Sequence, residues 1–264
     1  MESPVPFPVE RIHKVHETKI LGHFGREGVT VTKRDQRFAH ISPVLICFTN
    51  RSGSNTLAED LSQLPTCGLG KELMNHQAVV QISTRKGFAH LSDYLHHILA
   101  NQDCERPAIK VSVDQLLFLQ ASGVLGHCLY NARAIHIRRR DLLSQAVSFF
   151  IASVTKEWTS NHTRKGEPPE FNERRILKIM KNVSNANARF DMTLSILGLP
   201  KTVVFYEDHV GSRRESLDNL SFFLGMESVD FNLPEKRKRE RQGSSDKVEF
   251  TRRIRAKYGI HSTR

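Results

Sequence analysis

The segment from Asn50 to Thr56, Asn-Arg-Ser-Gly-Ser-Asn-Thr, combines the residue types of an anion-binding turn. Gly53 lets the backbone approach an anion closely, and the planar guanidinium of Arg51 suits the oxygens of phosphate or sulfate. Hydroxyl and amide donors are added by Ser52, Ser54, Asn55 and Thr56. Taken alone, the turn also fits a serine-rich helix cap with a solvated arginine.

Two other motifs that form such turns do not fit this one. A nucleoside triphosphatase loop needs G-x-x-x-x-G-K-[ST], which the sequence lacks. A hydrolase nucleophile between a strand and a helix needs G-x-S-x-G. Around Ser52 the flanking positions are Asn50 and Ser54, so the hydrolase motif fails.

A second group of basic residues stands farther along the chain. The run Ile135-His136-Ile137-Arg138-Arg139-Arg140-Asp141 leaves an apolar, strand-like stretch with three arginines. A helix that starts near Asp141 places Gln145 and Ser148 close to the strand end. The alternative is a solvated basic turn with Asp141 as helix cap. Two anion sites in one domain suit a nucleotide with phosphates at both ends, whereas a triphosphate needs a single cradle and usually Mg²⁺.

Apolar, β-branched runs predict strands, and amphipathic stretches predict helices between them. Strands are expected at 41–49, 108–113, 133–137 and 201–206, and helices at 57–64, 88–100, 141–158, 176–197, 217–224 and 246–258. This alternation predicts an α/β fold with a central parallel β-sheet flanked by helices. In such a sheet ligands bind at the carboxyl ends of the strands, where the Arg51 turn and the Arg139 run both stand.

Residues 1–40 are polar, basic and weakly periodic, so we expect a loosely ordered N-terminal extension followed by one domain over residues 41–264. The chain begins without a charged segment followed by an apolar run, and its apolar runs are too short to span a bilayer. Its four cysteines form neither a CxxC pair nor a dense disulfide framework. These features predict a cytoplasmic protein with reduced thiols and no transmembrane segment.

The formal net charge of +11 favours anionic partners without choosing among them. Nucleic acid is the competing interpretation, supported by the basic run at 236–241. The sequence has no helix-turn-helix, zinc-finger or RNP signature, and its aromatic residues, 8% of the chain, form no stacking platform. A basic nucleic-acid-binding protein, or another nucleotide-binding α/β protein, is therefore the alternative to an enzyme.

The order and spacing of several motifs resemble the bacterial trehalose 2-sulfotransferase family. They are Arg51-Ser52-Gly53-Ser54, then Glu72, then Arg139-Arg140-Asp141 followed by Gln145-Ala146-Val147-Ser148, and near the end Glu240-Arg241-Gln242. The resemblance runs from about residue 43 to the end. The sequence departs from the family at Asn55, where members usually have threonine, and at Leu73-Met74, where they often have aromatic residues. The second departure leaves the acceptor open.

The resemblance implies a P-loop-like sulfotransferase fold and an enzyme that uses 3′-phosphoadenosine 5′-phosphosulfate (PAPS) as its sulfuryl donor, without a metal. It implies that the 5′-phosphosulfate is held by Arg51, Ser52, Gly53, Ser54, Asn55 and Thr56. Either Arg139 or Arg140, together with Ser148, would hold the 3′-phosphate, and Arg241 would close over the nucleotide.

The resemblance also assigns the acceptor side of the reaction. Glu72 would be the catalytic general base that takes the proton of the acceptor hydroxyl. Without the resemblance, Glu72 fits a surface carboxylate better. Lys110, near the end of the second strand, fits either the cleft or the solvated end of the strand. The acceptor would be a carbohydrate or glycolipid. Members of the family dimerise, so a homodimer is implied, although no stretch of this sequence identifies an interface.

Overall fold

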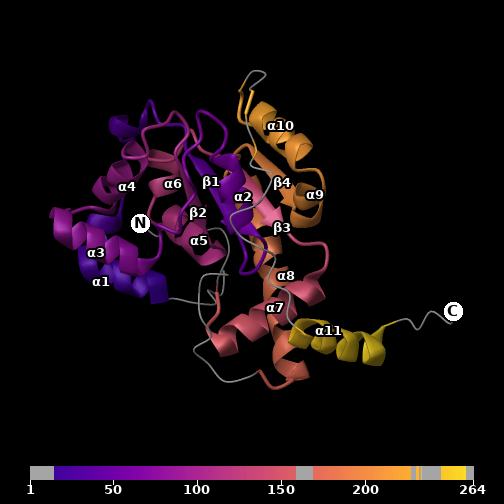
Figure 1. Ribbon diagram of the computed structural model, residues 1–264. Helices are drawn as coiled ribbons and strands as arrows, with labels where there is room; N and C mark the ends of the chain where they lie inside the picture. The colour runs from indigo at the N-terminus through magenta and orange to yellow at the C-terminus, as the bar shows by residue number, and fades with distance from the viewer. Residues whose placement is uncertain (1–14, 159–168, 227–229, 232, 234–244, 260–264) are drawn as a thin grey trace.

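The computed structural model describes residues 15–158, 169–226, 230–231, 233 and 245–259. At its centre is a parallel sheet of four strands in the order β2-β1-β3-β4 (Figure 1). The strands are β1 (Val44–Phe48), β2 (Ala108–Val111), β3 (Arg133–Arg138) and β4 (Lys201–Phe205). Helices flank this sheet, so the predicted α/β fold is confirmed.

The register of the strands brings their carboxyl ends to one edge of the sheet. All residues of the central strand β1 are buried, as its apolar composition predicts. Cys47 of β1 lies opposite Val111 of β2 and opposite His136 of β3. The chain passes from β1 to β2 on one side and to β3 and β4 on the other. The carboxyl ends of β1 and β3 therefore flank the point where such sheets bind ligands.

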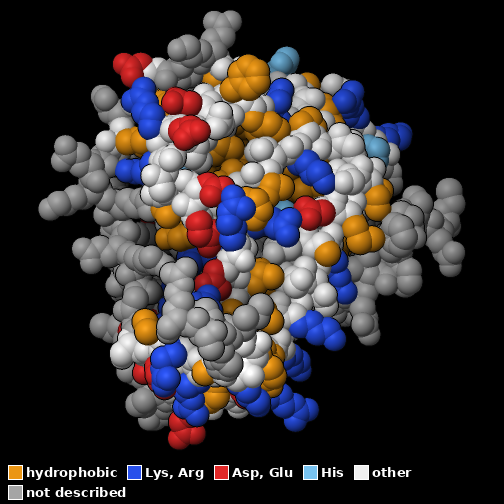
Figure 2. All heavy atoms as spheres, turned by 90° about the vertical axis from the view of Figure 1, so that its right-hand side faces the viewer, with side chains coloured by type: hydrophobic (Ala, Val, Ile, Leu, Met, Phe, Trp, Pro, Cys, Tyr) orange, Lys and Arg blue, Asp and Glu red, His pale blue; other side chains and the backbone are white. Residues whose placement is uncertain are grey.

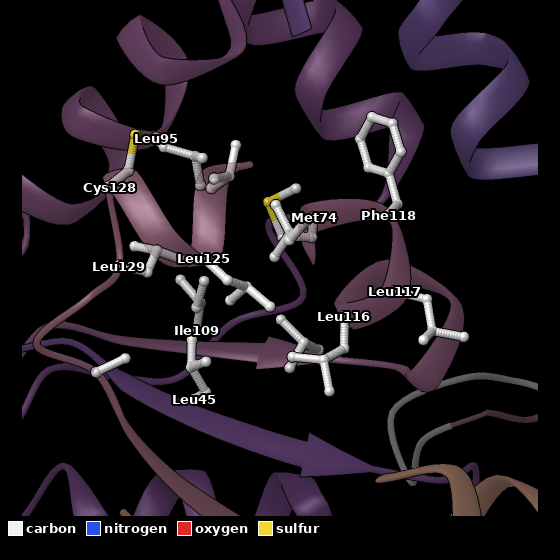
Figure 3. Close-up of a cluster of buried hydrophobic side chains, with 14 of the residues drawn as sticks. Leu45, Met74, Leu95, Ile109, Leu116, Leu117, Phe118, Leu125, Cys128 and Leu129 are labelled. Atoms are coloured by element: carbon white, nitrogen blue, oxygen red, sulfur yellow. The ribbon is translucent and has the colours of Figure 1, made fainter. Parts of the chain in front are cut away.

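One face of the sheet packs against helices from the first half of the chain and against one long later helix. These are α1 (Val15–Val29), α3 (His76–Lys86), α4 (Leu91–Ala100), α5 (Val113–Ala121), α6 (Val124–His127) and α8 (Glu173–Ile196). A short 3₁₀ helix, η1 (Gln36–Phe38), adds Phe38 to the same core. Figure 3 shows Leu45 and Ile109 of the sheet gathered with Leu116 and Leu125 of the helices.

The opposite face packs against α2 (Ser54–Leu61), α9 (Tyr206–Gly211) and α10 (Arg213–Phe223). Because successive strand residues point to opposite faces, Ile46 joins this second cluster while its neighbours Leu45 and Cys47 join the first. A third cluster connects α7 (Leu142–Thr155), α8 and α11 (Ser245–Tyr258) through Phe150, Ile176 and Phe250. The helix α2 and the helix α7 both begin at the carboxyl edge of the sheet.

Helix α1 lies in a segment where the sequence predicts a loosely ordered extension. It packs on α3, α4 and α5, and its residues Ile20 and Val29 are buried with strand residues. The sequence does not predict α3 either. Helix α3 buries only Val79 and Ser83, so its apolar periodicity is weak. Helix α1 buries Ile20 and Val29 but is interrupted by a non-helical Gly25.

The length of the helices and the state of the cysteine thiols concern membrane insertion and disulfide formation. Over the described residues, no helix has the length and apolar content needed to cross a bilayer. The four cysteines, Cys47, Cys67, Cys104 and Cys128, are all free. Burial raises the pKa of the Cys47 thiol, which therefore stays protonated at neutral pH.

Candidate active site

The turn between β1 and α2 carries the residues predicted to bind an anion. It bends through two residues with positive φ, Arg51 at 65° and Gly53 at 97°, and the first of these is an uncommon conformation for arginine. Helix α2 begins at Ser54. The N–H groups of Ser54, Asn55 and Thr56 therefore have no intrahelical partner and form the positive end of the helix dipole. Backbone donors thus stand at the carboxyl edge of the central strand.

Arg51 connects this turn to helix α7 and to the segment that follows it. Its Nε donates to Ser148 Oγ at 3.0 Å, and its Nη1 donates to the carbonyl oxygen of Trp158 at 2.7 Å. Burial lowers the pKa of the guanidinium, and the neighbouring charge of Arg139 lowers it further. The resemblance assigns Arg51 to the 5′-phosphosulfate and Ser148 to the 3′-phosphate. Their contact shows that the two predicted positions adjoin.

Ser52 and Gln145 are completely buried where the turn meets α7. Gln145 Nε2 donates to Thr49 Oγ1 at 2.9 Å and to the carbonyl oxygen of Asn50 at 2.8 Å, so α7 anchors the turn. Among the described residues, Ser52 Oγ and Gln145 Oε1 have no hydrogen-bond partner. A buried polar atom of this kind is costly unless a ligand or a water supplies the partner.

Arg139 and Arg140, which follow β3, have different neighbours. The Arg139 guanidinium lies 4.0 Å from the centre of the Tyr206 ring and close enough to Arg51 to affect its pKa. The Arg140 guanidinium instead pairs with Asp208 Oδ2 at 2.5 Å and stacks 4.1 Å from the centre of the Phe205 ring. Figure 2 shows acidic and basic side chains lying next to one another on the side of the molecule that carries α9. Arg139 is therefore the arginine that adjoins the Arg51 turn.

Tyr206, the first residue of α9, contacts both anion-binding segments. Its ring lies so close to Gly53 that a Cβ at position 53 would come within 2.1 Å of Tyr206 Cδ2. This contact and the φ of 97° together require glycine at that position. The same ring lies against the guanidinium of Arg139. Tyr206 thus joins the turn after β1 to the turn after β3.

Glu72 lies on the β2 side of the Arg51 turn. The segment before it runs beside β2, where the Lys110 N–H donates to the carbonyl oxygen of Lys71 at 2.9 Å. Glu72 Oε1 accepts from Lys110 Nζ at 2.8 Å, and the same ammonium contacts Asn55 Oδ1 and lies 3.5 Å from Ser54 Oγ. The Lys110 side chain is 3% exposed and that of Glu72 is 50% exposed. Lys110 therefore connects the predicted base to the anion-binding turn.

Three residues of this site are not among the predicted binding or catalytic residues: Lys110, Tyr206 and Trp158. A lysine inside an apolar strand is the signal for Lys110, since a buried ammonium needs polar partners. Tyr206 could be found because it follows a strand directly and so stands at the carboxyl edge of the sheet. Trp158 contributes a backbone carbonyl, for which its residue type gives no signal.

The remaining expectations concern Arg241, the basic run at 236–241 and the lack of a metal site. Arg241 and the basic run at 236–241 lie outside the described residues. Within the described ranges, no group of three or more His, Cys, Asp or Glu residues is arranged to hold a metal ion.

No protein-family model and no curated protein sequence matches this chain. Among solved structures, it is similar to a sulfotransferase from Alicyclobacillus acidocaldarius, with 16% identity and a TM-score of 0.53 over 86% of this chain and 93% of that chain. It is also similar to the sulfotransferase domain of the olefin synthase of Synechococcus PCC 7002, with 18% identity and a TM-score of 0.49 over 75% and 76% of the two chains. Mouse sulfotransferase SULT7A1 complexed with PAP matches with 12% identity and a TM-score of 0.43 over 82% and 67%. The first of these similarities shows that the chain has a sulfotransferase fold, as the sequence predicts.

Proposed function

We propose that this chain is a PAPS-dependent sulfotransferase, which transfers a sulfuryl group to a hydroxyl of a carbohydrate or glycolipid. The observation that carries the proposal is the meeting of Arg51 and Arg139 at the carboxyl ends of β1 and β3. The Tyr206 ring lies against Arg139 and against Gly53 of the Arg51 turn, so the two basic segments adjoin one ring, an arrangement that suits an anionic ligand. The fold shared with the Alicyclobacillus sulfotransferase supports the same class of ligand.

The residues of the two strand ends fit a nucleotide with phosphates at its 3′ and 5′ positions. PAPS supplies an activated sulfuryl group when it is bound. The 5′-phosphosulfate is assigned to the turn from Arg51 to Thr56, where the first N–H groups of α2 and the buried Ser52 Oγ are suitable donors. The 3′-phosphate is assigned to Arg139 with Ser148, since Arg139 lies against Tyr206 beside the Arg51 turn. The closing role of Arg241 stays a prediction.

Glu72 is the general base in this proposal. Half of its side chain is exposed, so an acceptor hydroxyl can reach the carboxylate. A positioned base contributes about 10²–10⁴-fold to the rate of such a reaction. Lys110 orients this carboxylate through their contact at 2.8 Å. As a buried ammonium beside Asn55, Lys110 also places positive charge next to the turn, where negative charge develops on the leaving group.

The acceptor class rests on the resemblance to the trehalose 2-sulfotransferase family, so trehalose is the first acceptor to test. The net charge of +11 also suits an acceptor that already carries negative charge. The homodimer is proposed on the same resemblance. The cytoplasmic location is proposed because the four cysteines form neither a CxxC pair nor a dense disulfide framework.

Thermal unfolding with and without 3′-phosphoadenosine 5′-phosphate (PAP) tests the donor. A ligand that binds only the native state raises the free energy of unfolding by about 2.7 kcal/mol at a hundredfold excess over its Kd. We expect PAP to stabilise the protein and duplex DNA to leave it unchanged. Stabilisation by DNA and none by PAP would refute the proposal in favour of nucleic-acid binding. Transfer of label from radiolabelled PAPS to a panel of sugars then identifies the acceptor.

A further inference from the structure

We propose that helix α9 sets the spacing between the two anion-binding segments, with Tyr206, Glu207 and His209 as positioning residues. The spacing would select a nucleotide phosphorylated at both its 3′ and 5′ positions. This inference rests on the proposed function, because it concerns the same donor site. Helix α9 directly follows β4, the strand that pairs with β3. Tyr206 contacts Gly53 in the turn after β1, and Glu207 accepts from the Arg140 N–H in the turn after β3.

Helix α9 holds α2, the helix that begins in the Arg51 turn, at both of its ends. At the first end, the Tyr206 ring lies against Gly53, the residue that caps α2. In the last turn, Asp60 Oδ2 lies 2.9 Å from His209 Nε2. The helix rises about 1.5 Å per residue, so these two contacts are about 10 Å apart along its axis. Two contacts so far apart determine the direction of α2 and hence of its N–H groups.

The contact at Asp60 is part of a buried polar network. Asp60 also accepts two hydrogen bonds from Arg213, and His209 Nδ1 lies 2.9 Å from Ser216 Oγ. The side chains of Asp60 and His209 are 3% and 0% exposed. Burial opposes ionisation of Asp60, but the hydrogen bonds from His209 and Arg213 outweigh it and hold the carboxyl pKa below its usual value. The ionised network therefore locks α2 to α9 and to the start of α10.

The same helix also holds the turn that follows β3. Glu207 Oε2 accepts from the backbone N–H of Arg140 at 3.1 Å, and Asp208 pairs with the Arg140 guanidinium. Arg139, the preceding residue, lies against the ring of Tyr206. Consecutive residues of α9 therefore contact the Arg139 segment on one side and α2 on the other.

The affinity of a ligand with two phosphates depends on the distance between the two sites, because both phosphates must be bound at once. The affinity of a ligand with one phosphate does not depend on that distance. Binding of the second phosphate is an intramolecular event, whose advantage is lost when the geometry does not allow both contacts at once. Loosening α9 should therefore weaken PAP far more than adenosine 5′-monophosphate. A variant that merely destabilised the fold would weaken both ligands alike.

The test measures the Kd values of PAP and adenosine 5′-monophosphate by calorimetry for the full chain and its variants. We expect His209→Ala to lose about tenfold or more in PAP affinity and to change adenosine 5′-monophosphate affinity by less than about twofold. His209→Gln, whose amide can still donate to Asp60, should recover most of the loss. Glu207→Ala, a partly exposed change that leaves the buried network intact, should show the same selective loss and decides the question if His209→Ala does not fold.

Val79→Ala is the matched control, because it removes buried apolar contacts from α3 on the other face of the sheet. It should lower stability without changing the ratio of the two affinities. Equal losses for both ligands in the α9 variants, or no loss in Glu207→Ala, would overturn the spacing role. A native protein that binds PAP no better than adenosine 5′-monophosphate would instead overturn the proposed function itself.

Discussion

Replacing Lys110 with methionine removes a buried charge from the candidate site while keeping most of the volume of the side chain. Lys110 Nζ contacts Glu72 and the start of α2, and the side chain is 3% exposed. The change therefore separates two roles that a buried lysine can have. It either holds the fold together or serves the reaction at the expense of stability.

The distance and burial of Lys110 give the expected size of the change in stability and of the change in turnover. The distance of 2.8 Å between Lys110 Nζ and Glu72 Oε1 corresponds to an attraction of about 1.5 kcal/mol at the dielectric constant of water and about 6 kcal/mol at an effective dielectric constant of about 20. Because half of Glu72 is exposed, the attraction lies toward the lower value. Burying the ammonium costs several kcal/mol, so Lys110→Met should leave the free energy of unfolding unchanged or raise it by about 1 kcal/mol. Turnover should fall by about 10²–10³-fold, the usual loss for one electrostatic donor.

Guanidinium denaturation measures the first quantity, and the initial rate of label transfer from radiolabelled PAPS measures the second. Lys71→Met is the control, because Lys71 is an exposed neighbour of Glu72. It should change neither quantity. A Lys110→Met protein that loses stability in proportion to its turnover would show that Lys110 is structural. Unchanged turnover would remove it from the mechanism.

Three further predictions concern the donor, the base and acid stability. Glu72→Gln should lower turnover by about 10²–10⁴-fold and leave PAP affinity, measured by calorimetry, unchanged; wild-type turnover would exclude Glu72 as the base. Arg51→Ala and Arg139→Ala should each weaken PAP binding by about 1.5–3 kcal/mol, whereas Arg140→Ala should weaken it by much less; equal losses for Arg139 and Arg140 would contradict the assignment of the 3′-phosphate. The pKa of Asp60 in the folded protein lies below its ordinary value of 3.8. The ionised carboxylate therefore stabilises the protein at pH values above 3.8. This stabilisation is lost as the pH falls through the pKa of Asp60 in the folded protein. The difference in stability between the wild type and Asp60→Asn should therefore close below about pH 4 in acid titrations followed by circular dichroism, and a constant difference would show that the carboxylate charge is not its source.

The sheet and the anion-binding turn are predictable from the sequence because local composition determines them. Buried parallel strands are short apolar runs, and β1 at Val44–Phe48 is one. The turn after it shows its chemistry in its residue types. Helix α1 is different, because Gly22, Gly25 and Gly28 weaken its helical signal and Gly25 is non-helical, although Ile20 and Val29 are buried.

The proposed choice of Arg139 over Arg140 depends on neighbours that the sequence does not reveal. The two residues are adjacent and chemically identical, so only their neighbours distinguish them. Those neighbours, Tyr206 for Arg139 and Asp208 for Arg140, both come from α9, which directly follows β4. Their positions depend on the pairing of β3 with β4, which is a property of the whole fold.

The contact between Lys110 and Glu72 has the same origin. It arises because the segment that ends at Lys71 runs beside β2 and so brings the next residue to the ammonium. No local pattern around Glu72 predicts that pairing. The resemblance to a family indicated the residue, and the fold supplies its partner.

The parallel arrangement of the strands also determines when the site can form. Each strand pairing joins segments far apart in the chain, as with Cys47 beside His136, and closing such long loops costs entropy before any contact repays it. Parallel sheets fold slowly for this reason. Arg51 and Arg139 come together only after β1 and β3 have paired, so the proposed nucleotide, which would bridge them, would bind only the finished fold. Bound nucleotide should therefore slow unfolding and leave the rate of folding almost unchanged.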